Sequence, residues 1–533
     1  MSDVTVTASA AAIPPYISAL LAEGAPHWGS GGTVLDSGSV GGGTSVTYAF
    51  LTSARQISSA DAFGFAAMSS AQRSAVRQAL AAWNAVANIS FVETADVSTA
   101  TIAFGTNRQS GRSAAYTYYP STAAQGGQVF IANDSPTNST PNLGSYGYMT
   151  LVHEIGHALG LKHPGNYNAG SSDGAEPPYL PSDQDNYAYS VMSYHSNSTL
   201  PSGRYLTGPS LYDIAAIQYL YGANLSTGIG DTGYTLDTGG FTTLWDPTGR
   251  NSLDGSSQTA ALSLDLRAGQ FSSAGGTTVL ALAYGTRIQA ATGGSGNDSF
   301  TVNTLGNVLD GGAGTDTVVF SGRRAQYRVQ QLDAGRTIVS GADGNDLLTN
   351  IEYLRFSDSS TALSDSMSGS FDALRYIASN PDLITAYGTN ASAGTVHLIN
   401  GGVYEGRSLT GFDPYNYLAG YSDLLAVFGS NITLATQHYI LAGQREGRRS
   451  GLFDVWSYEA SNPDLIRAFG SNTEAAELHY IQAGRFEGRS LTAFNATAYL
   501  AANPDVAAAY GGSLLGAKQH YVLSGYAEGR ALA

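Results

Sequence analysis

The sequence predicts a multidomain protein that combines an α/β domain, a parallel β-roll or β-sandwich domain and a C-terminal α-helical repeat array. Three observations support this prediction. Strand and helix patterns alternate before about residue 225, glycine-rich nonapeptides occur within residues 293–319, and a 41-residue period begins at residue 371. A chain of 533 residues is long enough for about three or four domains, each with its own core.

The predicted α/β domain spans residues 31–225. Residues 1–30 are small and irregular, which fits either a loose terminus or a removable pro-segment. Within the α/β domain, short apolar runs predict strands at residues 46–50, 89–92, 101–104, 115–119 and 128–131. Helices are expected from about Ser70, where Val76, Leu80 and Trp83 share one face, and over residues 148–159 and 212–221.

The β-roll prediction covers residues 226–365. Gly293–Thr301 and Gly311–Val319 both fit the nonapeptide G-G-x-G-x-D-x-U-x, which is typical of calcium-binding β-rolls. Calcium takes carboxylate and carbonyl oxygens as ligands. The candidate calcium residues of these turns are Gly294, Gly296, Asp298, Gly311, Gly312, Gly314 and Asp316.

Residues 371–533 read as four 41-residue helical repeats, each of about three short helices. Phenylalanine, histidine and a Glu-Gly-Arg triplet recur at the same place in each unit, the histidines being His397, His438, His479 and His520. One histidine at the same position of each repeat fits a structural role better than a metal site. An array of this size suggests binding, and we expect a cell-surface or glycan partner.

Composition narrows the function classes. The chain has 25 Lys and Arg against 41 Asp and Glu, a net charge of -16, which disfavours binding to nucleic acid or to anionic membranes. It contains no Cys, so any metal must be held by His, Asp, Glu, Tyr or backbone oxygen. No apolar run approaches the ~18–20 residues of a membrane span. The first cation is Arg55, so a signal peptide with a positive N-terminal region is not expected.

The most informative stretch is H-E-x-x-H-x-x-G-x-x-H, which begins at His153. His153 and His157 are spaced i, i+4 on a predicted helix, so both imidazoles leave the same face and can bind one metal ion. Gly160 allows the turn that brings His163 back as a third nitrogen ligand. Three neutral nitrogens with one open position are typical of catalytic zinc, and Glu154 is placed to act on the attacking water. The competing interpretation is that these histidines are structural residues of a helix, with ordinary hydrogen-bond partners and no metal ion.

This stretch resembles the metzincins, and Ser190–Tyr194 resembles their Met-turn. Tyr194, together with Asp213–Gln218 and Tyr221–Asn224, is similar to the serralysins, and the likeness covers about residues 28–360. It implies a metzincin-type catalytic domain in which Met192 lies under the zinc and Tyr194 is a further, switchable zinc ligand. It also implies calcium in the roll and near Gly228, Gly230, Thr232 and Asp246. Where the family tends to have Asp, this chain has Asn251, which should weaken that second calcium site.

The resemblance and the residues together predict a secreted zinc endopeptidase. Glu154 would assist the attack of zinc-bound water on the peptide bond, and Tyr194 would donate to the oxyanion. The strand within residues 115–119 would lie at a sheet edge and pair with an extended protein or peptide substrate. Export by a type I route, with association at the cell surface through the repeats, is expected. The alternative is a surface-attachment or structural protein that keeps a vestigial protease domain.

Overall fold

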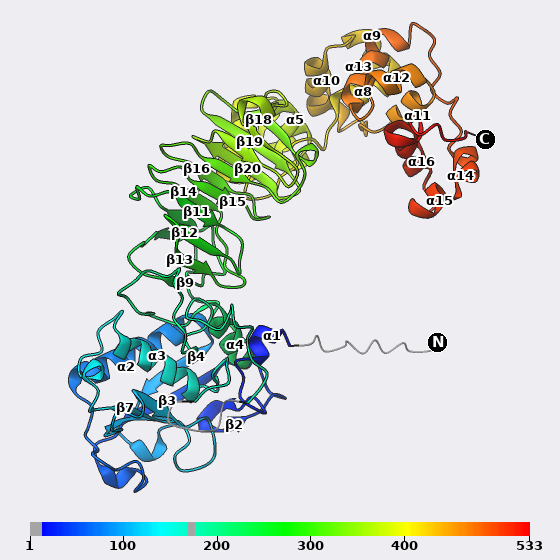
Figure 1. The fold of residues 1–533 in the computed structure, drawn as a ribbon. Coiled ribbons are helices and arrows are strands. Elements are labelled where there is room, and N and C mark those ends of the chain that lie inside the picture. The colour runs from blue at the N-terminus through cyan, green and yellow to red at the C-terminus, as the bar shows by residue number, and fades with distance from the viewer. Residues whose placement is uncertain (1–12, 169–175, 533) are drawn as a thin grey trace. The chain divides into compact units, whose positions relative to one another are not determined.

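The computed structural model describes residues 13–168 and 176–532 (Figure 1). The chain forms two compact units, Met1–Ser368 and Gly369–Ala533. The first unit contains an α/β part followed by stacked β-strands, and the second is helical. Among the described residues, no helix has the length and apolar character needed to cross a membrane.

A five-stranded sheet forms the centre of the α/β part. Its strands are β3 (Thr44–Phe50), β4 (Ile89–Glu93), β5 (Ile102–Asn107), β6 (Ala115–Thr117) and β7 (Gln128–Ala132). The order is β4-β3-β5-β7-β6, and all neighbours are parallel except β6, which runs antiparallel to β7. The short β6 therefore lies at the edge of the sheet, as the sequence predicted for this segment.

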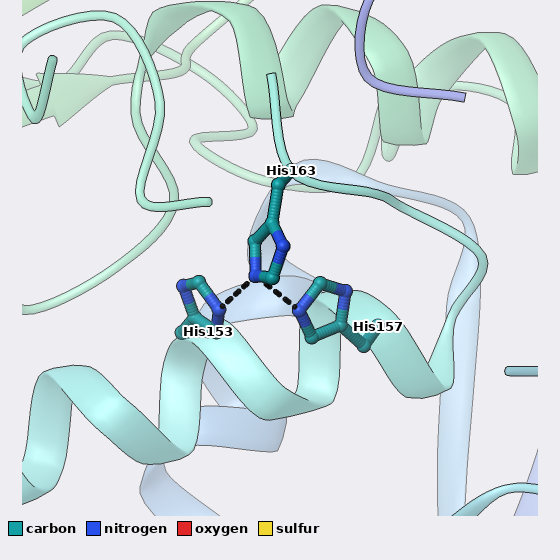
Figure 2. Close-up of side chains that lie close together, drawn as sticks. All are labelled: His153, His157 and His163. Atoms are coloured by element: carbon teal, nitrogen blue, oxygen red, sulfur yellow. Dashed lines mark hydrogen bonds between the residues drawn. The ribbon is translucent and has the colours of Figure 1, made fainter. Parts of the chain in front are cut away.

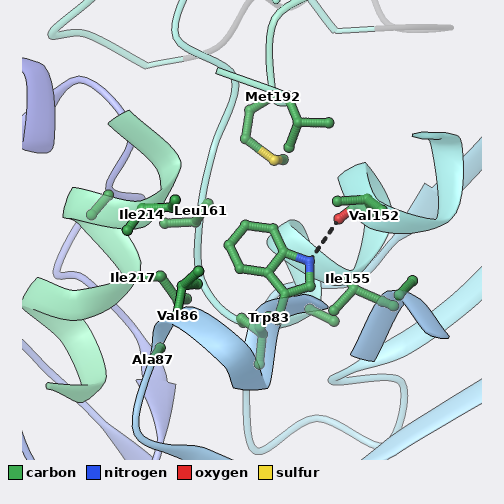
Figure 3. Packing of buried hydrophobic residues seen from close by; sticks show 14 of the residues in the cluster. Trp83, Val86, Ala87, Val152, Ile155, Leu161, Met192, Ile214 and Ile217 are labelled. Carbon is green, nitrogen blue, oxygen red and sulfur yellow. Dashed lines mark hydrogen bonds between the residues drawn. The ribbon is translucent and has the colours of Figure 1, made fainter. Parts of the chain in front are cut away.

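The helices α2 (Ser70–Val86) and α3 (Tyr146–Ala158) pack against this sheet, and α4 (Leu211–Tyr221) joins the same hydrophobic core. The α2 helix begins where expected because Ser69 and Gln72 form a reciprocal capping box. Its predicted buried face is confirmed, with Trp83 fully buried and its Nε1 atom donating to the Val152 carbonyl of α3 at 3.1 Å (Figure 3). This bond fixes α3 against α2.

The N-terminal segment belongs to the same core. It contains the short helix α1 (Pro15–Ser18) and the paired strands β1 (His27–Trp28) and β2 (Val34–Leu35). Leu20 is fully buried, and the Trp28 indole donates to the Ala158 carbonyl at 2.7 Å. Removing residues up to 30 would open this core, so we expect any processing site to precede Pro14.

The β-roll part consists of short strands in two facing sheets. The strands are β8 (Gly233–Thr235), β9 (Thr242–Leu244), β10 (Ser252–Asp254), β11 (Leu262–Asp265), β12 (Phe271–Ala274), β13 (Thr277–Leu282), β14 (Ala290–Thr292), β15 (Ser299–Thr301), β16 (Val308–Asp310), β17 (Thr317–Val319), β18 (Arg328–Gln331), β19 (Arg336–Gly341), β20 (Gly344–Thr349), β21 (Tyr353–Arg355) and β22 (Ser360–Ala362). Their orders are β18-β19-β20-β16-β14-β10-β8 and β22-β21-β17-β15-β11-β12-β13-β9.

Parallel stacking in the roll follows from the three-residue strands. In each nonapeptide the apolar position is the buried middle of its strand, Phe300 in β15 and Val318 in β17, and these two residues are paired. They join one core with Leu264, Leu309 and Leu354. The chain alternates between the two sheets, so the glycine-rich turns before β15 and β17 lie one above the other.

The second unit repeats one order of three helices four times. The helices are α5 (Ala373–Ala378), α6 (Pro381–Tyr387) and α7 (Ala391–His397), then α8 (Pro414–Ala419), α9 (Ser422–Phe428) and α10 (Ile432–His438), then α11 (Val455–Ala460), α12 (Pro463–Ala468) and α13 (Thr473–His479), and finally α14 (Ala496–Ala502), α15 (Pro504–Ala509) and α16 (Leu514–His520). Each third helix continues into a π-type turn.

A buried tyrosine holds each of these units together. In the first, Tyr376 is fully buried and its hydroxyl lies 2.8 Å from Nδ1 of His397. A Cβ atom on Gly402 would lie 2.1 Å from this hydroxyl, so only glycine fits there. The same contact recurs at Tyr417–His438, Tyr458–His479 and Tyr499–His520. These contacts support a structural role for the four repeat histidines.

Candidate metal centre and active site

The histidine motif lies on α3 and the turn that follows it. His153 and His157 project from one face of the helix, and His163 approaches them from the returning chain (Figure 2). The return depends on Gly160, whose φ is 108° and whose place leaves no room for a side chain, since a Cβ atom would lie 2.3 Å from the Pro26 carbonyl oxygen. The predicted turn at Gly160 is therefore confirmed.

The three imidazoles converge through their Nε2 atoms. Nε2 of His163 lies 3.2 Å from that of His153 and 3.0 Å from that of His157. Two nitrogens that bind a tetrahedral zinc at about 2.0–2.1 Å lie about 3.3 Å apart. Within the described residues this is the one cluster of three or more potential metal-ligating side chains.

The other ring nitrogens show why the convergence fits a cation. Nδ1 of His153 contacts the Val191 carbonyl at 2.8 Å, Nδ1 of His157 contacts the Leu161 carbonyl at 2.7 Å, and Nδ1 of His163 contacts the side-chain oxygen of Asn168 at 2.7 Å. Because these oxygens only accept, each Nδ1 donates and each Nε2 keeps its lone pair. Three lone pairs that face one another repel unless a cation lies between them, so this donor set fits zinc.

Burial keeps the cluster neutral. Desolvation, and then the charge of His163, lower the pKa of His153 to about 3. Desolvation likewise lowers the pKa of His157 well below its usual value. All three side chains are therefore available as neutral ligands near pH 7.

Glu154 lies beside the first histidine, and within the described residues Thr117 is its hydrogen-bond donor. It is 5% exposed, and the Thr117 hydroxyl donates to its Oε2 atom at 2.6 Å. Burial raises the pKa of Glu154 to about 7, and the bond from Thr117 opposes that rise. Sequence reasoning did not find Thr117, because its contact with Glu154 depends on how β6 packs against α3.

Alternation along the edge strand explains why Thr117 reaches the site. Thr117 points toward α3, while its neighbours Tyr116 and Tyr118 point the other way and donate to Oδ1 of Asp61 at 2.7 and 3.0 Å. Asp61 is nearly fully buried, so these bonds fix the strand from behind. The sequence carried no signal for Asp61, which lies in a loop 55 residues before Tyr116.

Met192, the methionine of the Met-turn resemblance, packs against the helix that carries His153 and His157. Met192 is fully buried in the cluster that contains Trp83 and Ile155 (Figure 3), and a Cβ atom on Gly156 would lie 2.5 Å from its sulfur. Asp213 holds the turn by accepting from the Ser190 hydroxyl and the Val191 amide, both at 2.6 Å. Burial raises the pKa of Asp213 to about 6.

Tyr194 lies beside the cluster. Its ring centroid is 4.6 Å from that of His163 and 5.8 Å from that of His153. The Tyr167 ring stacks on the Tyr194 ring with centroids 4.7 Å apart. The Tyr167 hydroxyl accepts a hydrogen bond from the Tyr194 backbone amide at 3.3 Å and donates one to Asp185 at 2.7 Å. The structure therefore brings Tyr194 to the histidines, on a support that the sequence did not reveal.

The candidate calcium residues of the two nonapeptides come together in stacked turns. A Cβ atom on Gly312 would lie 2.4 Å from the Gly294 carbonyl oxygen, and one on Gly314 would lie 2.1 Å from that of Gly296. The predicted glycines are thus required by close approach of the two turns. Gly311 is equally confined, because a Cβ atom there would lie 2.0 Å from the Asn350 carbonyl oxygen.

The aspartates of these turns form a ladder. Asp298 accepts from the Leu262 amide at 2.7 Å, Asp316 accepts from the Asp298 amide at 2.7 Å, and Glu352 accepts from the Asp316 amide at 2.7 Å. Burial, followed by the charges of Asp298, Glu352 and Asp310, raises the pKa of Asp316 to about 6. A cation would relieve this repulsion. Glu352 was missed because it lies outside both nonapeptides.

The third group of calcium candidates lies where the α/β part meets the roll. Asp246 is fully buried, accepts from the Tyr234 hydroxyl at 2.6 Å, and leaves no room for a side chain at Gly228. The Thr232 amide donates to Asn251 Oδ1 at 3.1 Å. The Gly230 carbonyl oxygen lies against Gly249. Carbonyl, amide and carboxylate oxygens therefore gather here, with one carboxylate among them.

Known proteins match both parts of the first unit. Residues 44–169 match the Matrixin family model, and residues 223–397 match the model of the serralysin C terminal region of peptidase family M10. Both matched segments are therefore similar to parts of known zinc-peptidase families. The chain is 39% identical over 295 residues to the metallopeptidase AprA of Pseudomonas marginalis, 39% over 274 residues to a serralysin of Proteus mirabilis, and 36% over 282 residues to serralysin A of Dickeya chrysanthemi.

These matches cover 45–50% of this chain and 55–61% of the relatives. Zinc is the cofactor of the site formed by the three histidines. Calcium is the cofactor of the region that matches the serralysin C-terminal model. The histidine triad thus has both the geometry and the family context of a zinc site.

Proposed function

We propose that the chain is a secreted zinc endopeptidase. The convergence of three histidine Nε2 atoms next to the buried carboxyl of Glu154 and beneath an edge strand supports this most directly. His153, His157 and His163 would hold the zinc ion, with Tyr194 as a further ligand. When bound, zinc acts as a Lewis acid that polarises the scissile carbonyl and lowers the pKa of water.

The protein's own groups carry the remaining steps. Glu154 takes a proton from the attacking water and passes it to the leaving amine. Thr117 holds the Glu154 carboxyl in place from β6. The same strand has a free edge that can pair with an extended peptide, which brings the peptide bond past Glu154. Tyr194 donates its hydroxyl to the oxyanion that forms.

The choice between an enzyme and a vestigial domain can be tested at Glu154. We expect full-length protein to cut casein and to contain zinc, and Glu154→Gln to keep zinc while losing at least about 10³ in turnover. Glu93→Gln, which changes a surface carboxyl of β4, is the matched control. Zinc-loaded parent protein that cuts neither casein nor peptides would favour the surface-attachment alternative.

Calcium in the roll is a second part of the proposal. It is supported by the close turns and by the ladder of Asp298, Asp316 and Glu352. Calcium would bind Gly294, Gly296, Gly311, Gly312, Gly314 and both aspartates, and a weaker site would use Gly228, Gly230, Thr232 and Asp246. On chelation, amide exchange should rise in residues 226–365 before it rises in residues 371–533. Equal loss of protection in both segments would exclude this role.

Export by a type I route and attachment through residues 369–533 complete the proposal. The array is rich in exposed uncharged side chains and contains a single Lys, which suits a glycan or cell-wall partner better than an anionic one. Binding of the isolated protein to bacterial cell-wall material, competed by soluble glycans, would test the partner class.

A further inference from the structure

A side-chain pocket opens next to the candidate active site. It has a volume of about 360 Å³ and lies between the start of β6, helix α3 and the segment that carries Tyr187 and Tyr194. His153 and Glu154 are among its lining residues. A substrate side chain next to the cleaved bond can therefore enter this pocket, an argument that depends on the proposed proteolytic function.

The pocket has no counter-ion for a charged substrate side chain. Its lining contains no Lys, Arg or Asp, and its one carboxyl, Glu154, is committed to the reaction and to Thr117. A charged side chain that enters would lose its hydration without gaining a counter-ion, which disfavours its binding. Neutral side chains are therefore favoured.

Most polar groups of the lining are already used inside the protein. The Ser113 hydroxyl donates to Gln109, the Thr150 hydroxyl donates to the Tyr146 carbonyl, and the Ser193 hydroxyl donates to Asp185. These groups therefore have little capacity to select a substrate.

Tyr146 and Tyr187 differ from this set. Both line the pocket, and neither hydroxyl has a hydrogen-bond partner among the residues that the structure describes. Burial, followed by the neighbouring Tyr146 and Tyr205, raises the pKa of Tyr187 to about 12, so its hydroxyl stays protonated and can donate a hydrogen bond near neutral pH. An apolar side chain would displace water from both hydroxyls without replacing its hydrogen bonds, which disfavours its binding.

We propose that this pocket selects long, uncharged substrate side chains that end in a hydrogen-bonding group. Tyrosine and glutamine meet both conditions. Phenylalanine and methionine are their apolar counterparts of similar size, and glutamate is the charged counterpart of glutamine. Tyr146 and Tyr187 are the residues that make the distinction, because their hydroxyls can each donate and accept.

The experiment uses full-length, zinc-loaded protein and one peptide series. A peptide library read by mass spectrometry first locates the substrate position with the strongest preference next to the cut. Peptides that carry Tyr, Phe, Gln, Met or Glu at that position then give kcat/KM values. We expect Tyr over Phe and Gln over Met by about tenfold, and Gln over Glu by more.

Variants assign the preference to its residues. Tyr146→Phe and Tyr187→Phe should each lower the Tyr/Phe ratio, and the double variant should bring it near 1. Tyr189→Phe, which removes a hydroxyl two residues from Tyr187 but outside the lining, should leave the ratio unchanged.

The outcomes distinguish a failure of the selectivity inference from a failure of the proposed proteolytic function. Equal rates for Tyr and Phe peptides, a preference for Glu, or a Tyr/Phe ratio unchanged in the double variant would overturn the inference while leaving proteolysis intact. Absence of any cleavage by the zinc-loaded parent would overturn the proposed function itself, and this inference with it.

Discussion

In residues 1–368, three histidines turn their Nε2 atoms toward one another, whereas in residues 369–533 four histidines lie 41 residues apart, each against its own tyrosine. In the first set Nδ1 donates to an oxygen, which leaves Nε2 as a free electron pair. In the second set Nδ1 is taken by a tyrosine hydroxyl. Nδ1 has an oxygen partner in both sets, so the convergence of the Nε2 atoms is what distinguishes the candidate metal ligands from the repeat histidines.

Paired substitutions offer the strongest way to break this comparison. His157→Ala should remove zinc and lower peptide cleavage by at least about 10⁴, because it deletes one of three ligands. His438→Ala should leave zinc and cleavage unchanged and destabilise the repeats by about 1–3 kcal/mol, since the Tyr417 hydroxyl loses its buried partner. Zinc content, turnover and thermal unfolding are measured on both variants. Loss of zinc in His438→Ala would end the distinction.

Tyr194 sharpens the same comparison, because it is a tyrosine beside histidines in the first unit. Its ring stacks on Tyr167 and flanks His163, so it is not a buried structural tyrosine like Tyr376. Tyr194→Phe should lower kcat by about 10²–10³ and retain zinc, since an oxyanion donor is lost. The matched control is Tyr189→Phe. Unchanged kcat would remove Tyr194 from the mechanism.

Thr117 should give a smaller effect. Thr117→Val keeps the shape of the side chain but removes the hydroxyl that donates to Glu154. We expect kcat to fall about tenfold with little change in KM, because one hydrogen bond to a charged group contributes about 1.5 kcal/mol. Thr117→Ser restores the hydroxyl and should restore kcat. A fall of the same size in both variants would point to packing rather than to this bond.

The sequence predicted the three histidine ligands and the character of each region of the chain. It did not predict the side chains that hold the site residues in place. H-E-x-x-H-x-x-G-x-x-H is local, so spacing on one helix and one turn determines where His153, His157 and His163 lie. Thr117, Asp61 and Asp185 act across the fold and leave no local pattern. The three-residue strands of the roll were predictable at their buried middle positions, whereas Glu352 joins the aspartate ladder only through stacking of distant turns.

Two buried carboxyls in the third repeat allow a test of stability in the second unit. Glu459 is fully buried where the other repeats have Ile377, Leu418 and Leu500, and neither of its oxygens has a partner in the described structure. Burial raises its pKa to about 8. Glu477 behaves alike, because burial and then the charge of Asp413 raise its pKa to about 8.

The raised pKa values of Glu459 and Glu477 determine how the stability of the repeats changes with pH. The folded state holds the proton more tightly than the unfolded state, so stability is fully present below about pH 4.5 and is lost as pH rises toward about 8. Glu459→Leu should raise the free energy of unfolding of the repeats by about 2 kcal/mol at pH 7 and flatten this dependence. Thermal unfolding from pH 5 to 9 measures both, and Glu405→Gln, an exposed carboxyl, is the control. A steeper loss of stability in Glu459→Leu would contradict the assignment.

Removal of the second unit should have the smallest effect on peptide cleavage. The histidines, Glu154, Thr117 and Tyr194 all lie within Met1–Ser368, which has its own core. Each repeat is held by contacts within itself and with other repeats, such as Tyr376–His397, Arg375–Glu474 and Lys518–Asp454. A chain that ends at Ser368 should therefore cut a short peptide within about twofold of the full-length rate, while it loses retention on cell-wall material. A truncated protein that still folds and binds zinc but no longer cuts the peptide would show that the repeats belong to the catalytic unit.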